Sequence, residues 1–206
     1  MTDREQPQIY LVTPPAFEIA PFTDRLAAVL DAHPVACLRV AMASADEYTV
    51  ASSADACREV AHARDVAVVL ERHVALAGRL GLDGVHLADG ARGVRAARKA
   101  LGPDAIVGAF CGTSRHDGMT AGEAGADYVS FGPAGQTALG GGARAERALF
   151  EWWSEMIELP VVAEGALDEA AVAALAPVSD FLAFGEEIWR EEDASAALAL
   201  LVAAMS

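Results

Sequence analysis

The stretch CGTSRHDG, residues 111–118, contains residue types that proton-transfer chemistry uses. Histidine, here His116, is the residue type best suited to both accept and donate a proton near neutral pH. Cys111 and Ser114 are close enough along the chain to contact the same ligand. A structural alternative also fits, in which Ser114 caps a helix whose first turn holds His116. Both interpretations stay open: we predict His116 as a catalytic residue and Ser114 as a substrate-binding residue.

A second candidate is Arg39, which lies inside the apolar run VACLRV. In a strand the side chains alternate, so Arg39 shares one face with Cys37. A buried arginine needs an anionic partner, and Glu71 and Glu164 each end another apolar run. We predict that one of these glutamates holds Arg39. Capture of a ligand carboxylate or phosphate is the alternative.

These candidates are set among eight short apolar runs that alternate with amphipathic segments. Continuous apolar strands separated by helices indicate parallel strands covered on both faces. Eight such units favour an α/β fold, a single (β/α)8 TIM barrel over residues 1–206. The alternative is an open doubly wound sheet, which would usually carry a glycine fingerprint after its first strand. The runs are 9–12, 35–40, 66–70, 84–87, 105–110, 128–131, 160–163 and 181–184.

In such a barrel the functional residues lie at the C-terminal ends of the strands and in the loops that follow. The candidates above fall at these positions, as do His86 in GVHL and Thr137 in the loop after YVSF. We predict both as substrate-binding residues, although His86 also suits a buried polar network.

Local signals place helix starts and suggest an internal repeat. Ser53 and Asp168 precede helical patterns, and both are residue types that cap helices. Asp83, Asp127 and Asp180 each stand just before an apolar run. Their spacing favours repeated βα units over a short solenoid repeat.

Composition limits the partners. The chain has 30 acidic and 15 basic residues, a formal net charge of −15, which argues against nucleic acid and anionic membranes. No apolar run reaches the ~18 residues of a transmembrane helix, and from the polar, acidic N-terminus we expect neither a signal peptide nor a transit peptide. Three scattered cysteines fit reduced thiols in a cytoplasm. We predict a cytoplasmic protein with a small-molecule ligand. A homodimer contact at Trp152 and Trp153 is left open.

The chain resembles the thiamine phosphate synthase superfamily, which includes the TenI-type thiazole tautomerases. The matching stretches IYLVT, LRV, GLDGVHL, TSRHD, AGADYVSFGP and PVVAEGAL occur in family order over nearly the whole chain. The resemblance implies a (β/α)8 barrel that joins a pyrimidine pyrophosphate to a thiazole phosphate with Mg²⁺. In TenI-like members His116 would shuttle the proton of a thiazole tautomerisation. A third alternative is a re-purposed or non-catalytic barrel that binds another small molecule.

The positions that match the family's pyrophosphate and metal motifs carry different residues. The pattern Gln-x-Arg-x-Lys reads CLRVA at 37–41, so only Arg39 matches. The Asn-Asp after the third strand reads Glu71-Arg72, and a cation at that place does not suit a magnesium site, which needs oxygen ligands. We therefore predict that the family's magnesium site is lost and that the chain holds no metal or cofactor.

The positions that match the phosphate-binding end are altered as well. The loop after the sixth strand keeps Thr137 but has no lysine, and GEE at 185–187 follows the eighth strand. Glutamates in the first turn of the last helix would stabilise it, yet repel a phosphate by about 4 kcal/mol per pair at ~4 Å. By position in the motifs, the predicted substrate-binding residues are Arg39, Glu71, His86, Ser114, Thr137, Glu164, Gly165 and Gly185.

Overall fold

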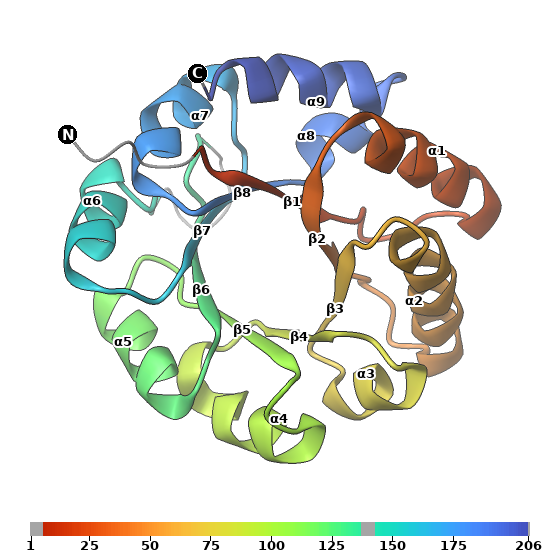
Figure 1. The fold of residues 1–206 in the computed structure, drawn as a ribbon, viewed down its shortest axis with the longest axis horizontal. Coiled ribbons are helices and arrows are strands. Elements are labelled where there is room, and N and C mark those ends of the chain that lie inside the picture. The colour runs from red at the N-terminus through yellow and green to blue at the C-terminus, as the bar shows by residue number, and fades with distance from the viewer. Residues whose placement is uncertain (1–5, 137–142, 206) are drawn as a thin grey trace.

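A computed structural model describes residues 6–136 and 143–205, in which eight parallel strands close into a barrel. Each strand pairs with its neighbours in chain order, and β8 pairs with β1 (Figure 1). The predicted (β/α)8 barrel is confirmed, while Thr137 lies outside the described residues. The strands are β1 (Gln8–Val12), β2 (Val35–Val40), β3 (Ala67–Glu71), β4 (Gly84–Leu87), β5 (Ile106–Phe110), β6 (Tyr128–Phe131), β7 (Val161–Glu164) and β8 (Phe181–Phe184).

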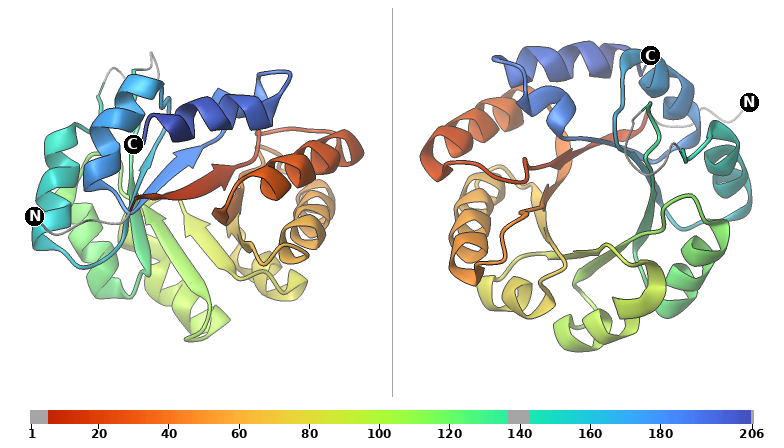
Figure 2. Two further views of the ribbon diagram at one scale, coloured as in Figure 1. Left: turned by 45° about the horizontal axis from the view of Figure 1, so that its top comes forward. Right: turned by 180° about the vertical axis from the view of Figure 1, so that it is seen from behind.

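The helices form an outer layer around the ring of strands, as both faces of the molecule show (Figures 1 and 2). Their bounds are α1 (Ile19–Ala32), α2 (Glu47–His62), α3 (Val74–Leu80), α4 (Val94–Leu101), α5 (Arg115–Ala124), α6 (Arg147–Met156), α7 (Glu169–Leu175), α8 (Glu186–Trp189) and α9 (Ala194–Ala203), with short 3-10 turns η1 (Gly90–Gly93) and η3 (Ala176–Val178). No helix in the described ranges is long and apolar enough to cross a membrane.

One of the two predicted helix starts is correct. Asp168 caps α7, because its carboxylate accepts a hydrogen bond of 2.8 Å from the backbone of Ala171. The start at Ser53 is wrong: this residue is buried in the middle of α2. That helix begins two turns earlier, where the carboxylate of Asp46 accepts from the backbone of Thr49 at 2.9 Å.

Each of the three repeated aspartates joins two neighbouring strands at their N-terminal ends through a pair of hydrogen bonds, which we call an aspartate bracket. The backbone N–H of Asp83 donates to the carbonyl of Val68 in β3 at 2.9 Å, and its carboxylate accepts from the N–H of Val68 at 2.7 Å. The same bracket joins Asp127 to Val107, at 2.8 and 2.7 Å, and Asp180 to Val161, at 3.0 and 2.8 Å. Three successive strand pairs, β3/β4, β5/β6 and β7/β8, are thus joined in the same way.

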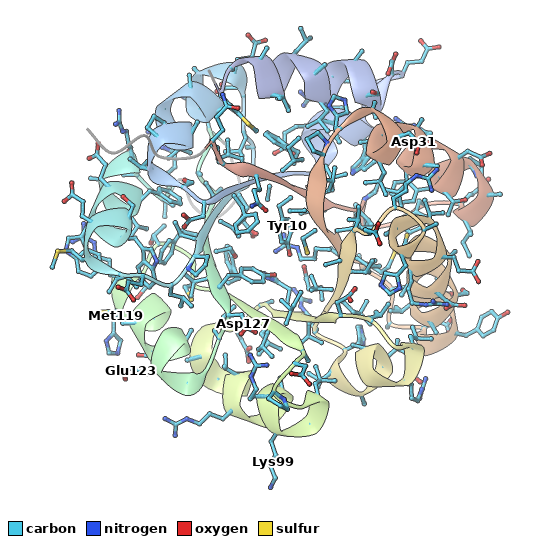
Figure 3. The ribbon with its side chains drawn as sticks, viewed as in Figure 1. Tyr10, Asp31, Lys99, Met119, Glu123 and Asp127 are labelled. Atoms are coloured by element: carbon cyan, nitrogen blue, oxygen red, sulfur yellow. The ribbon has the colours of Figure 1, made fainter. Side chains whose placement is uncertain are left out.

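Apolar side chains fill the barrel on both sides of the sheet. The larger core lies between strands and helices, and Trp153 and Phe150 are fully buried in it. A smaller cluster fills the interior, where Tyr10 and Tyr128 are the largest members. Figure 3 shows Tyr10 inside the ring of strands and Lys99 on the outside of α4.

Candidate active site

A chain of buried polar side chains crosses the interior of the barrel. Arg39 on β2 approaches His86 on β4, with 2.7 Å between Nη1 and Nε2. The Nδ1 of His86 lies 2.9 Å from the hydroxyl of Tyr128 on β6, and that hydroxyl lies 2.8 Å from the hydroxyl of Tyr10 on β1. Four strands therefore supply one connected network, which is the structural alternative for His86; this histidine is buried and is not among the described residues that line the cavity below, so its predicted substrate-binding role stays a prediction.

The chemistry of these groups sets the direction of the hydrogen bonds. A guanidinium only donates, so the Nε2 of His86 accepts, and the neutral ring carries its proton on Nδ1. His86 then donates to the hydroxyl of Tyr128, which shares a hydrogen bond with the hydroxyl of Tyr10 in which either oxygen can be the donor. Burial, followed by the nearby charge of Arg39, holds the pKa of His86 well below its usual value. Burial also raises the pKa of Tyr128. The network is therefore uncharged beyond Arg39.

The buried histidine predicts a loss of stability in mild acid. The unfolded chain binds a proton at His86 below about pH 6.5, whereas the folded chain, with its depressed pKa, does not. Stability therefore falls as the pH drops, by about 1 kcal/mol between pH 7 and 5.5 from this group. Urea unfolding of the native protein and of His86→Gln should show the smaller pH slope in the variant. Equal slopes would contradict a neutral buried His86.

Arg39 is held by acidic residues at the mouth, as predicted. Its Nη1 lies 2.8 Å from Oε2 of Glu164 at the end of β7. Its Nε lies 3.7 Å from Oε2 of Glu71 at the end of β3, which is an ion-pair distance but too long for a hydrogen bond. Among the described residues this Nε has no hydrogen-bond partner. Burial disfavours the guanidinium charge, but the attraction of Glu164 prevails and raises the pKa of Arg39.

A cavity of about 520 Å³ opens at the C-terminal ends of the strands, above this ion pair. It brings together four of the predicted substrate-binding residues, Arg39, Glu164, Gly165 and Gly185. Its described lining includes no histidine, cysteine, lysine or hydroxyl-bearing side chain. The full lining is Val12, Arg39, Phe110, Gly132, Pro133, Glu164, Gly165, Ala166, Ala183, Gly185, Glu186, Glu187 and Arg190.

The structure places His116 and Ser114 apart from this cavity. The hydroxyl of Ser114 caps α5 by accepting from the backbone of Asp117 at 3.1 Å. His116 is exposed in the first turn of the same helix and is not among the described residues that line the cavity. The helix-cap alternative for Ser114 therefore holds, and a catalytic role for His116 stays a prediction.

One feature of the site, the pair of buried tyrosines Tyr10 and Tyr128, was not identified from the sequence. The inward positions of Tyr10 and Tyr128 follow strand alternation, and their hydroxyls inside apolar runs were the available signal for a polar network. Glu186 and Glu187 do stand in a first turn, but that of the four-residue α8, not of the last helix. Both glutamates line the cavity.

Eight parallel strands closed into a ring, with a cavity at their C-terminal mouth, define a TIM-barrel protein. The family model described as thiamine monophosphate synthase matches residues 9–184, and the chain belongs to this family.

The relatives agree with this assignment. The thiamine-phosphate synthase of Rhodospirillum centenum is 40% identical over 194 residues, which cover 92% of this chain and 93% of the relative. That of Hyphomonas neptunium is 38% identical over 208 residues, covering 96% and 94%. Among solved structures, the thiamine phosphate pyrophosphorylase of Pyrococcus furiosus superposes with a TM-score of 0.83 at 19% identity, over 96% of this chain and 95% of the other, which shows the shared fold.

Proposed function

We propose that this chain is a diverged member of the thiamine phosphate synthase family, linked to thiamine biosynthesis, that binds a small molecule without carrying out the full synthase reaction. The observation that carries the proposal is the pairing of Arg39 with Glu164 at 2.8 Å. Arg39 is the residue that matches the family's pyrophosphate-binding motif. With a carboxylate already on its guanidinium, it offers little attraction to a second anion.

The residues at the expected magnesium site do not fit a divalent cation. Glu71 lies 3.2 Å from Nη2 of Arg72 and 3.7 Å from Nε of Arg39, so its carboxylate already faces two guanidinium groups, which would repel a divalent cation. Magnesium needs oxygen ligands, usually one or two carboxylates together with phosphate oxygens. In residues 6–136 and 143–205 no three histidines, cysteines or carboxylates lie where they could hold a metal ion.

The proposal predicts that the protein does not form thiamine phosphate. It is incubated with the pyrimidine pyrophosphate, the thiazole phosphate and Mg²⁺, and thiamine phosphate is followed by fluorescence after oxidation to thiochrome. The Rhodospirillum centenum relative, 40% identical, serves as the positive control under the same conditions. We expect product only with the relative. Formation of thiamine phosphate by the native chain at a rate comparable to that of the relative would overturn the proposal.

The tautomerase alternative has less support. It needs His116 beside the ligand, whereas His116 is exposed on α5 and the described lining of the cavity contains no histidine. Thiazole isomerisation that is present in the native protein and lost in His116→Ala would favour this alternative over the binding function.

A further inference from the structure

The carboxylate of Glu187 is turned back onto the backbone at the wall of the cavity. Its Oε2 accepts a hydrogen bond of 2.8 Å from the N–H of Gly185, directly after β8. Its Oε1 accepts one of 3.1 Å from the N–H of Leu167, in the loop after β7. One side chain therefore joins the two loops that follow the last strands, and Glu187 and Gly185 both line the cavity.

Backbone N–H groups that converge from these two loops are the groups with which many barrels bind a ligand phosphate. Here both hydrogens are already taken by an anion that belongs to the chain. An incoming phosphate would have to displace the carboxylate of Glu187 and would still meet its negative charge at close range. The carboxylate of Glu187, which is part of the chain, therefore occupies the place at this wall where a ligand anion would bind.

The floor of the cavity offers no compensating positive charge. Arg39 is only 6% exposed, and its charge is balanced by Glu164. The remaining charged lining consists of Glu186, Glu187 and Arg190, and the Nε of Arg190 lies 3.3 Å from Glu191. The ionised groups around the ligand space therefore sum to a negative charge.

We infer that Glu187 is a specificity-determining residue, which excludes phosphorylated ligands from this cavity and selects a ligand whose corresponding end is uncharged or cationic, such as an alcohol or an amine. This inference deepens the proposed function and rests on it, because it requires that the mouth of the barrel binds a small molecule.

Calorimetric titration with inorganic phosphate tests the inference on the native protein, Glu187→Ala and Glu186→Ala. Removing the carboxylate of Glu187 frees two N–H groups, so we expect Glu187→Ala to bind phosphate at least tenfold more tightly than the native chain. Glu186→Ala is the matched control, because it removes the same charge from the adjacent position while both hydrogen bonds to Glu187 remain. We expect little gain from it.

Two results would overturn the inference. One is no gain of phosphate affinity in Glu187→Ala; the other is an equal gain in Glu186→Ala, since general charge alone would then explain the effect. If Glu187→Ala does not fold, Glu187→Gln replaces it, which keeps the side-chain size, loses the charge and should also bind phosphate more tightly than the native chain.

The outcomes also separate this inference from the proposed function. Formation of thiamine phosphate by the native protein would end the proposed function. Phosphate binding by the native protein as tight as that of Glu187→Ala, without turnover, would end the inference about Glu187 alone.

Discussion

Replacement of Arg39 by methionine is expected to lower the free energy of unfolding by about 3–5 kcal/mol, the cost of breaking a buried ion pair. Methionine keeps much of the side-chain volume but leaves the carboxylate of Glu164 without its partner at 2.8 Å. It also leaves the Nε2 of His86 without its donor. Because the free energy of unfolding of a domain is only about 5–15 kcal/mol, this single change should clearly lower the midpoint of urea unfolding.

Two controls show whether the loss comes from the broken pair. In Arg39→Met/Glu164→Leu both charges are gone, so most of the lost stability should return. Arg79→Met removes an arginine from an exposed pair with Glu47, and we expect its unfolding midpoint to stay almost unchanged. A cost for Arg39→Met that is no larger than for Arg79→Met, or no recovery in the double variant, would contradict a buried pair.

Replacement of Gly84 by alanine is expected to cost more than about 4 kcal/mol, enough to remove most of the soluble folded protein. A Cβ at this position would lie 1.8 Å from the backbone carbonyl oxygen of Ile106, far closer than atoms can approach. Gly84 and Ile106 are paired in the sheet, so relief requires β4 and β5 to separate. Soluble yield and the urea midpoint measure the effect.

Gly78→Ala is the matched control for this substitution. Gly78 lies inside α3, where a Cβ would meet only the side chain of Leu101 at 3.2 Å. Alanine favours a helix over glycine by up to about 1 kcal/mol, so the protein should be as stable as the native chain or slightly more stable. Gly84→Ala protein that is as stable as Gly78→Ala would show that the strands do not approach as described.

The strands could be predicted from the sequence because buried parallel strands appear as continuous apolar runs. The first and last residues of each run differ from those of the observed strand by at most one position. The start of α2 could not be predicted from the sequence. Asp46 and Ser53 are both residue types that cap helices, and the choice depends on packing, since Ser53 lies on the helix face that is buried against the barrel. Gly84 likewise shows no sign in the sequence of its close approach to β5.

The site could be predicted in part. Strand alternation places Arg39 inward, and the need for an anionic partner points to a glutamate, so the pair with Glu164 was predictable. The contact of His86 with Tyr128, and of Tyr128 with Tyr10, could not be predicted, because these residues come from strands that meet only when the barrel closes. The direction of the Glu187 carboxylate depends on a side-chain rotamer and on the loop after β7, which sequence patterns do not report.

The aspartates that join neighbouring strands stabilise the barrel at the N-terminal ends of the strands, whereas the cavity that would bind a ligand lies at the C-terminal ends. Each of them spans neighbouring strands through backbone groups, at the end of the barrel away from the cavity. Evolution could therefore exchange side chains in the mouth without disturbing the pairing of these strands. A gene that inherits such a barrel can change its ligand while the architecture, and with it the recognisable ancestry, is retained.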